Sequence, residues 1–227
     1  MEKLYKQPYE NPDLAKIYED RYIHHPDQKQ DVNFEIRAIE KTLDYYDYES
    51  WCDVACGTGY HLQNVNSKVK KVGVDKSKHM LDYAKLSDKT NTIYHQKDLV
   101  KGVDSLGSYD LVTAFGYGYS HQKTLTDVLK FIKNLANLTN KGGDVLIGYD
   151  GVPNFCDTLG WHNGLGELKV KAIITDYYQE SGTDYIDCIS PTKETIIESI
   201  YDDFESVEII KLPVSWKNTL LHFRNKK

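Results

Sequence analysis

The amino-acid sequence predicts an α/β fold around a mostly parallel sheet, and three observations lead to this fold class. The stretch from Ser50 to Leu62, SWCDVACGTGYHL, has the pattern of a buried strand, a glycine turn and the start of a helix. A second apolar run ends in Gly73-Val74-Asp75. Apolar runs and helical patterns then alternate as far as Tyr149. Such alternation is typical of βαβ units, whose strands pair in parallel through right-handed crossovers.

The composition predicts one soluble domain. The chain has 227 residues, of which 40% are hydrophobic and 27% charged, and this length is sufficient for a sizeable core. The formal net charge is −6, and no long run of Lys or Arg is present, which argues against a nucleic-acid partner because such binding depends on clustered cations. No apolar run approaches the ~20 residues of a membrane span. We therefore expect no membrane partner and a cytoplasmic location, since the N-terminus also lacks the pattern of a signal peptide.

Four cysteines are scattered through the chain, and no metal site is predicted from them. Cys52 and Cys56 flank the entry to the glycine turn, whereas Cys156 and Cys188 lie far along the sequence. No two pairs have zinc-finger spacing. We interpret Cys52 and Cys56 as small side chains in a tight, buried turn.

The first part of the chain is predicted to be helical and is rich in tyrosine. A first helix starts at Pro12, a residue suited to the first turn, and places Tyr18 and Tyr22 on one apolar stripe. A second helix is expected from Val32 to Tyr45. Between them, His24-His25-Pro26-Asp27 interrupts the pattern and is interpreted as a solvated loop.

The strands after the glycine turn end in residues that could bind a ligand. Further strands are predicted from Lys71 to Asp75, up to Asp98-Leu99, from Tyr109 to Phe115 and from Asp144 to Tyr149, with helices from Ser77 to Ala84 and from Lys123 to Leu138 between them. Asp53, Asp75, Asp98 and Phe115 all fall at the carboxyl ends of strands. Ligands of open parallel sheets bind beyond these ends.

The last third of the chain is expected to complete the sheet. Two strands, from Glu167 to Tyr178 and from Asp184 to Ile189, form a small hairpin inserted after the fifth strand. A helix then opens at Ser190-Pro191-Thr192. The segments from Val207 to Leu212 and from Thr219 to Phe223 close the sheet as an antiparallel pair, which gives seven strands with an antiparallel last strand.

The glycine turn and the acid that ends the second strand resemble those of the class I S-adenosylmethionine-dependent methyltransferases. In this superfamily a DVACGTG-type loop wraps the methionine end of the cofactor, and the acid holds the ribose; Asp75 matches this acid. Ala55 occupies the first glycine position of the usual E/D-x-G-x-G-x-G loop, a departure also seen in small-molecule members. An NAD fingerprint would need a third glycine near Leu62, and there is none.

Two further segments are similar to the aminosugar N,N-dimethyltransferase and glycine N-methyltransferase group. One is the tyrosine-bearing N-terminal segment, which in those relatives forms a lid over the cofactor. The other is AFGYGYSH, a turn of small residues that ends in His121. The resemblance implies a Rossmann-like class I methyltransferase sheet in a single domain, residues 1–227. Residues 1–48 would form the helical lid, residues 49–150 the cofactor-binding core, and residues 151–227 the acceptor-side hairpin and the closure of the sheet.

The resemblance also implies the site residues. His121 is expected to act as the base or to orient the acceptor, because the ordinary pKa of histidine, near 6.5, suits proton acceptance at neutral pH; the alternative is a helix cap. Tyr18 is the second expected catalytic residue, unless it only packs on the core. Asp98 would receive the adenine amino group and Leu99 would offer its N–H. The residues expected to bind S-adenosylmethionine are Tyr22, Asp53, Ala55, Cys56, Gly57, Gly59, Asp75, Lys76, Met80, Asp98, Leu99 and Phe115.

The predicted function is transfer of a methyl group from S-adenosylmethionine to an amine or hydroxyl of a small polar metabolite, such as an amino sugar. One alternative is an O-methyltransferase acting on a small carboxylate or phenol. Another is a non-catalytic cofactor-binding scaffold, which would not need Asp75 or Asp98. An oxidoreductase is disfavoured by the missing third glycine. A small-molecule acceptor is the expected partner, and the oligomeric state is left open, with a homodimer as one option.

Overall fold

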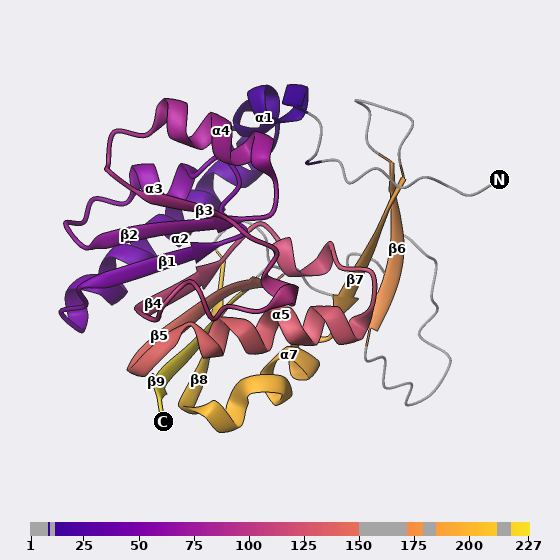
Figure 1. The fold of residues 1–227 in the computed structure, drawn as a ribbon. Coiled ribbons are helices and arrows are strands. Elements are labelled where there is room, and N and C mark those ends of the chain that lie inside the picture. Colours follow the sequence, from indigo (N-terminus) through magenta and orange to yellow (C-terminus); the bar gives the residue numbers. More distant parts are fainter. Residues whose placement is uncertain (1–8, 10–11, 150–171, 179–184, 213–218) are drawn as a thin grey trace.

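The computed structural model describes residues 9, 12–149, 172–178, 185–212 and 219–227. Seven strands form one twisted sheet in the order β3-β2-β1-β4-β5-β9-β8 (Figure 1). Strands β1 to β5 pair in parallel, and β9 runs antiparallel to both of its neighbours, β5 and β8. The predicted α/β class and the antiparallel last strand are thereby confirmed. The strands of the sheet are β1 (Ser50–Val54), β2 (Lys70–Asp75), β3 (Ile93–Gln96), β4 (Tyr109–Ala114), β5 (Thr139–Tyr149), β8 (Phe204–Lys211) and β9 (Thr219–Lys226).

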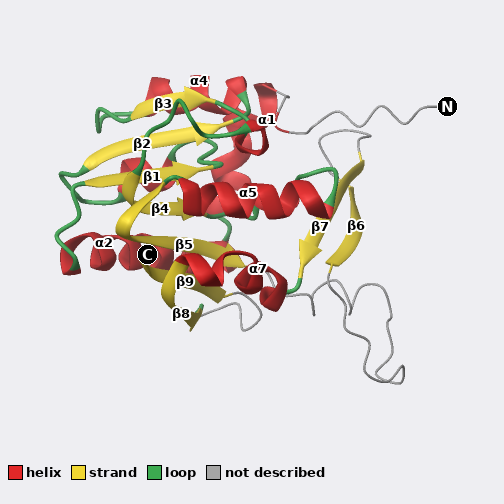
Figure 2. Ribbon diagram, turned by 60° about the horizontal axis from the view of Figure 1, so that its bottom comes forward, coloured by secondary structure: helices red, strands yellow, loops and turns green. Residues whose placement is uncertain are grey.

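Helices cover both faces of this sheet (Figure 2). One hydrophobic core joins α5 and α7 to residues such as Val54 and Val112, and the other joins α2, α3 and α4 to Trp51 and Leu111. Neighbouring residues of β1, Trp51 and Cys52, thus contribute to different cores, because side chains alternate along a strand. The helices are α1 (Pro12–Tyr18), α2 (Pro26–Tyr45), α3 (Tyr60–Asn64), α4 (Lys78–Ser87), α5 (Leu125–Asn137) and α7 (Lys193–Ile200), with a π-helical turn at Glu19–Ile23 and 3-10 turns at Leu99–Lys101, Gly118–Ser120 and Tyr201–Asp203.

The inserted hairpin is present as predicted. Strands β6 (Ala172–Tyr178) and β7 (Tyr185–Pro191) pair antiparallel and form a separate two-stranded sheet. The hairpin stands beside the ends of β4 and α5 in both views (Figures 1 and 2). The turn predicted at residues 181–183 and the loop predicted at residues 151–166, with Trp161, His162 and Asn163, lie outside the described residues.

Side-chain caps set the start of several helices. The predicted cap is confirmed at Ser77, whose hydroxyl accepts a hydrogen bond from the Met80 N–H at 3.2 Å. Thr124 and Thr192 cap α5 and α7 in the same manner. Each such cap satisfies one N–H that the first turn leaves without a partner, and it contributes about 1 kcal/mol.

Several predicted boundaries are wrong. Strand β5 begins at Thr139 and not at Asp144, and Ser190 and Pro191 end β7 instead of opening a helix. Helix α2 begins at Pro26, not near Val32, because proline has no N–H to lose in the first turn and its fixed φ suits a helix start. The expected loop is thus reduced to His24 and His25, which are exposed. Strand β3 ends at Gln96 and does not reach Asp98, because the Asp98 carboxylate accepts the Val100 N–H (3.2 Å) and caps a 3-10 turn.

No helix in the described part of the chain combines the length and the apolar character needed to cross a bilayer.

Candidate active site

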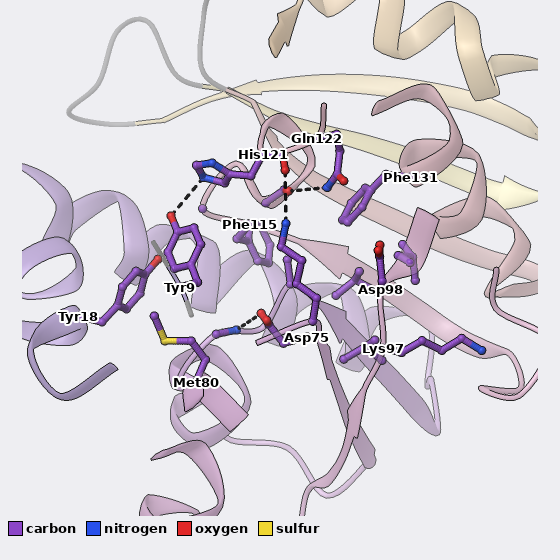
Figure 3. A pocket seen from close by; sticks show the side chains of 18 residues that line it. Tyr9, Tyr18, Asp75, Met80, Lys97, Asp98, Phe115, His121, Gln122 and Phe131 are labelled. Carbon is purple, nitrogen blue, oxygen red and sulfur yellow. Dashed lines mark hydrogen bonds between the residues drawn. The ribbon is translucent and has the colours of Figure 1, made fainter. Parts of the chain in front are cut away.

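A pocket of about 640 Å³ lies beyond the carboxyl ends of the central parallel strands (Figure 3). This is the edge at which the strand-end residues were expected to meet. Ten of the predicted site residues line it: Tyr18, Ala55, Gly57, Asp75, Lys76, Met80, Asp98, Leu99, Phe115 and His121. Tyr9, Val54, Val74, Lys97, Gly116, Gly118, Gln122 and Phe131 complete the lining.

The carboxylate of Asp75 is fixed by backbone groups at the base of the pocket. Its Oδ2 accepts the Gly57 N–H at 2.9 Å, and its Oδ1 accepts the Ser77 N–H at 2.7 Å. Burial raises the pKa of Asp75, while these N–H groups act in the opposite direction. A carboxylate has about four acceptor positions, so each oxygen retains a lone pair. Asp75 can therefore accept hydrogen bonds from two neighbouring hydroxyl groups of a ligand while it keeps its hydrogen bonds with the Gly57 and Ser77 N–H groups.

The loop after β1 has the backbone shape that a glycine loop needs, although its first position is alanine. Ala55 has φ 56° and Gly57 has φ 54°, both in the left-handed region. A side chain at Gly57 would meet no atom within 4 Å, so the loop leaves open space above this residue. The Ala55 methyl group is accommodated at Gly118, where an added Cβ would come closer to Ala55 Cβ than two carbons can approach. The departure from glycine at Ala55 is thus matched by the absence of a side chain at Gly118.

We expect Ala55 and Gly118 to behave as a coupled pair. Gly118→Ala should destabilise the fold by about 1–3 kcal/mol, because a rigid methyl group must displace another. Adding Ala55→Gly should restore most of that loss, since the double variant exchanges the two side chains. Ala55→Gly alone should be nearly neutral, because relief of the left-handed alanine offsets the entropy cost of glycine. Urea unfolding of the native protein, the two single variants and the double variant measures the coupling. If the changes in the free energy of unfolding were additive, they would contradict the pairing.

The opposite end of the pocket combines an acidic group with apolar walls. The Asp98 carboxylate lies 3.7 Å from the Lys101 ammonium, and it lines the pocket beside Leu99. The Leu99 carbonyl accepts a hydrogen bond from Asn134 Nδ2 at 2.7 Å, which ties this segment to α5. Phe131 of the same helix contributes to the wall. A flat heterocycle with an exocyclic amino group would fit this end chemically.

His121 lies where the pocket meets the N-terminal segment. Its Nε2 is 3.1 Å from Tyr9 Oη, and its carbonyl accepts a hydrogen bond from Lys76 Nζ at 3.3 Å. Burial, assisted by the positive charge of Lys76, lowers the pKa of His121 to about 4. The imidazole is therefore neutral at pH 7, and it is a weaker base than its ordinary pKa near 6.5 implied.

Tyr18 enters the pocket from the last turn of α1. Its hydroxyl lies 3.7 Å from the point where a side chain at Gly116 would begin. Burial, and next the negative charge of Asp75, raise the pKa of Tyr18, so its hydroxyl keeps its proton. Tyr18 can therefore offer a neutral phenol as hydrogen-bond donor or acceptor.

Four predicted cofactor-binding residues lie outside the pocket lining. Tyr22 packs on Tyr18, with ring centroids 5.1 Å apart. The Cys56 N–H donates to the Val74 carbonyl at 3.2 Å, and its thiol is free and buried, as expected for a tight turn. Gly59, with φ 73°, is packed so closely that a Cβ would lie 2.6 Å from the Tyr94 hydroxyl.

Asp53 is the fourth of these residues, and it belongs to a buried chain of hydrogen bonds. Thr113 Oγ1 accepts from Trp51 Nε1 at 2.9 Å and donates to Asp53 Oδ1 at 2.6 Å. Burial raises the pKa of Asp53 to about 6, although His61 and Thr113 act against this rise. Asp53 therefore links β1 to β4 through Thr113.

A buried ion pair next to Asp53 was not predicted from the sequence. His61 Nε2 lies 3.0 Å from Glu35 Oε2, and both side chains are almost covered. The His61 ring also stacks on Phe115 at 4.9 Å. Burial alone lowers the pKa of His61, but the hydrogen bond and charge of Glu35, with the charge of Asp53, raise it overall. This pair joins α2 to α3 behind the wall of the pocket.

We expect Asp53→Asn to stabilise the fold in a pH-dependent manner. The folded state holds the Asp53 proton more tightly than the unfolded chain, because the pKa rises from 3.8 to about 6. The cost of the buried charge is therefore absent below pH 4, grows between pH 4 and 6, and reaches about 2–3 kcal/mol above pH 6. Urea unfolding from pH 4 to 8 measures the free energy of unfolding of both proteins. The difference in favour of the variant should grow between pH 4 and 6.

Asp110→Asn is the control with the opposite sign. Burial by itself would raise the pKa of Asp110, but hydrogen bonds from Asn140, Ser50 and the Glu49 N–H lower it overall. The stabilisation by Asp110 is present above its unfolded pKa and is lost as the pH falls, so its removal should cost stability at neutral pH. A difference between Asp53→Asn and the native protein that did not change with pH would contradict the assignment of a raised pKa to Asp53.

The pocket also contains residues that the sequence analysis did not single out. Gly116, Gly118 and Gln122 belong to the turn after β4, and the string AFGYGYSH already placed two of them next to His121. Tyr9 had only one signal, its place among the N-terminal tyrosines. Glu35, which lies behind the pocket wall, had no such signal, because an acidic residue within an amphipathic helix is normally solvated. Within the described residues, no cluster of His, Cys, Asp and Glu could hold a metal ion.

Comparison with known proteins agrees with this geometry. Residues 52–143 match the model of a family described as a methyltransferase domain. A search of curated proteins finds no matching relative. This match covers less than half of the chain, and the predicted enzyme class and the predicted cofactor, S-adenosylmethionine, agree with it.

Solved structures confirm the fold over nearly the whole chain. An S-adenosylmethionine-dependent methyltransferase from Clostridium acetobutylicum has a TM-score of 0.66 at 15% identity, with 95% of this chain and 98% of that chain covered. The N-methyltransferase NodS from Bradyrhizobium japonicum, in complex with S-adenosylhomocysteine, has a TM-score of 0.63 at 13% identity, covering 94% and 99%. The sugar N-methyltransferase KedS8 from Streptoalloteichus has a TM-score of 0.60 at 14% identity, covering 87% of each chain. At these identities the likeness concerns the fold.

Proposed function

We propose that the protein transfers a methyl group from S-adenosylmethionine to an amine or hydroxyl of a small polar metabolite, with an amino sugar as the first candidate. One observation carries this proposal: a single pocket joins the fixed carboxylate of Asp75 to the neutral side chains of Tyr18 and His121. The Asp75 carboxylate is suited to binding the ribose of a nucleoside, and the neutral side chains of Tyr18 and His121 are suited to an uncharged nucleophile. The names of NodS and KedS8 describe N-methylation in those proteins, and they make an amine the first acceptor class to test here.

The residues present fit the proposed cofactor. Asp75 would accept the two ribose hydroxyls with its remaining lone pairs, and Asp98 with the Leu99 N–H would hold the adenine. The open space above Gly57 would take the methionine end. When bound, S-adenosylmethionine supplies a methyl group on a sulfonium sulfur, which keeps the electron pair of the broken bond as a neutral thioether.

The protein's own contribution would be alignment and exclusion of water. Holding two reactants in line can supply ~7–11 kcal/mol of a barrier. His121 would accept or orient the proton that the acceptor loses, and Tyr18 would help to hold the acceptor. A scaffold that only binds the cofactor would need neither group. Burial, assisted by the charge of Lys76, lowers the pKa of His121 and would keep its imidazole neutral and available as a hydrogen-bond acceptor.

A turnover assay tests the proposal directly. The protein is incubated with S-adenosylmethionine and with glucosamine, glucose, phenol or benzoate in turn, and release of S-adenosylhomocysteine is measured. We expect turnover with an amine or hydroxyl acceptor above the rate without acceptor. Calorimetry should show binding of S-adenosylhomocysteine but not of NAD. Binding of NAD alone would favour an oxidoreductase, and cofactor binding without turnover for any acceptor class would favour the scaffold.

We further expect the segment around Tyr9 and Tyr18 to act as a lid. Both residues line the pocket, and α1 packs on α4 through Leu14, Ala15 and Met80. Binding of S-adenosylhomocysteine should slow amide hydrogen exchange in residues 9–23, because a filled pocket holds these side chains in place. Exchange in β8, remote from the pocket, is the internal control. Equal exchange in residues 9–23 with and without ligand would contradict the lid.

A further inference from the structure

Tyr9 contacts His121 in two ways. Its hydroxyl lies 3.1 Å from His121 Nε2, and the two rings meet edge to face with centroids 5.1 Å apart and planes at 73° (Figure 3). Both side chains line the same pocket. A hydrogen bond at this distance, supported by ring packing, restricts both the position and the rotation of the imidazole.

Tyr9 is itself held by two other parts of the site. Its backbone carbonyl accepts a hydrogen bond from Ser77 Oγ. Ser77 also donates its N–H to Asp75 Oδ1, so this contact links Tyr9 to the predicted ribose-binding carboxylate. The Tyr9 ring packs on Tyr18 with centroids 6.2 Å apart. Tyr9 thus connects the Asp75 end of the pocket with the His121 end.

His121 lies in a short turn and not within a long helix or strand, so its ring orientation depends on side-chain contacts. It directly follows the 3-10 turn Gly118–Ser120, which is three residues long. Gly116 and Tyr117, just before that turn, have φ 58° and 55°. A neutral imidazole has one donor and one acceptor nitrogen, and the partner of one nitrogen decides where the proton resides. A phenol on Nε2 can therefore set both the ring orientation and the tautomer.

We propose that Tyr9 is a positioning residue for His121: its hydroxyl holds the imidazole in the orientation and tautomer in which His121 serves the acceptor. This inference rests on the proposed function. It adds that the N-terminal segment contributes to the reaction through a specific hydrogen bond, besides covering the pocket. The hydrogen bond from Ser77 to the Tyr9 carbonyl agrees with this role, because it fixes the backbone from which the Tyr9 side chain must orient His121.

A double-mutant cycle with Tyr9→Phe and His121→Asn tests the proposal. Tyr9→Phe keeps the ring and removes only the hydroxyl, so kcat should fall about 10-fold while KM for S-adenosylmethionine changes less than about 2-fold. In the His121→Asn background the same change should have almost no further effect, because the group being positioned is gone. A fall in kcat of equal size in both backgrounds, or unchanged kcat in Tyr9→Phe, would overturn the proposal.

Tyr83→Phe is the matched control. Tyr83 packs in the same cluster of Leu14, Ala15 and Met80, and its hydroxyl forms no hydrogen bond within the described part of the chain. Loss of this hydroxyl should leave kcat unchanged. A 10-fold fall in Tyr83→Phe as well would mean that any lost hydroxyl loosens the segment, and this would overturn a specific role for Tyr9.

A measurement without turnover separates this proposal from the proposed function. Imidazole ¹⁵N NMR of the ligand-free protein should show His121 in one tautomer, with well-separated shifts for its two nitrogens. In Tyr9→Phe the two shifts should move toward each other as the tautomers mix, whereas Tyr83→Phe should match the native protein. Unchanged shifts in Tyr9→Phe would overturn the positioning role even in an active enzyme. Native protein that binds no S-adenosylmethionine, with the NMR result as expected, would instead contradict the proposed function.

Discussion

Replacing Asp75 with alanine is expected to weaken S-adenosylmethionine binding by about 10²–10⁴-fold. Each of the two hydrogen bonds that the carboxylate would form with the ribose is charge-assisted and contributes ~1.5–3 kcal/mol, and each 1.4 kcal/mol corresponds to a tenfold change in affinity. The variant also leaves the N–H groups of Gly57 and Ser77 without their acceptor, so some of the loss will come from a looser loop. Calorimetry with S-adenosylhomocysteine measures the combined effect.

Asp88→Ala is a suitable control for the loop effect. Asp88 also accepts two backbone N–H groups, from Thr90 at 2.8 Å and Thr92 at 2.9 Å, but it lies outside the pocket. Its loss should lower stability in urea without changing cofactor affinity more than about 2-fold. Affinity in Asp75→Ala equal to that of the native protein would contradict the placement of the ribose at Asp75. A similar loss of affinity in Asp88→Ala would assign the effect to general loosening.

The sequence predicted the sheet and the strand-end residues that line the pocket well, because both depend on local patterns. Strand ends are marked by changes of periodicity, and parallel strands place their carboxyl ends at one edge, so Asp75 and Asp98 could be brought together without coordinates. Ala55 was predicted to replace a glycine, and it does have a left-handed φ. What the sequence could not reveal is its compensation by Gly118, because that contact joins segments 63 residues apart (118 − 55).

The surroundings of His121 were harder to predict because they depend on long-range contacts and burial. The Tyr9–His121 hydrogen bond spans 112 residues, and no periodicity encodes it. The pKa of His121 also depends on the position of the Lys76 charge, which sequence spacing does not give. Glu35 and His61 show the same limit: each fits a helical pattern alone, and only the packing of α2 on α3 makes them a buried pair.

His121→Asn is expected to lower turnover by about 10²-fold, at the lower end of the ~10²–10⁴ range typical of a general base. Asparagine can still form hydrogen bonds but cannot take up a proton near neutral pH. The effect should lie at the lower end because a base with a pKa of about 4 has little driving force for accepting a proton at pH 7. Cofactor affinity should change only a few-fold, since Asp75, Asp98 and Leu99 are expected to hold the adenosine.

The pH profile gives the sharper test of this role. A group with a pKa of about 4 is almost fully deprotonated above pH 6, so kcat/KM of the native enzyme should show no limb from His121 near pH 6.5 and should fall only as the pH approaches 4. This lower limb should be missing in His121→Asn. His95→Asn, which changes a histidine of β3 outside the pocket, should leave kcat/KM and its pH dependence unchanged. Normal turnover of His121→Asn on the true acceptor, or loss of cofactor binding instead, would return His121 to the role of a residue that shapes the turn before α5.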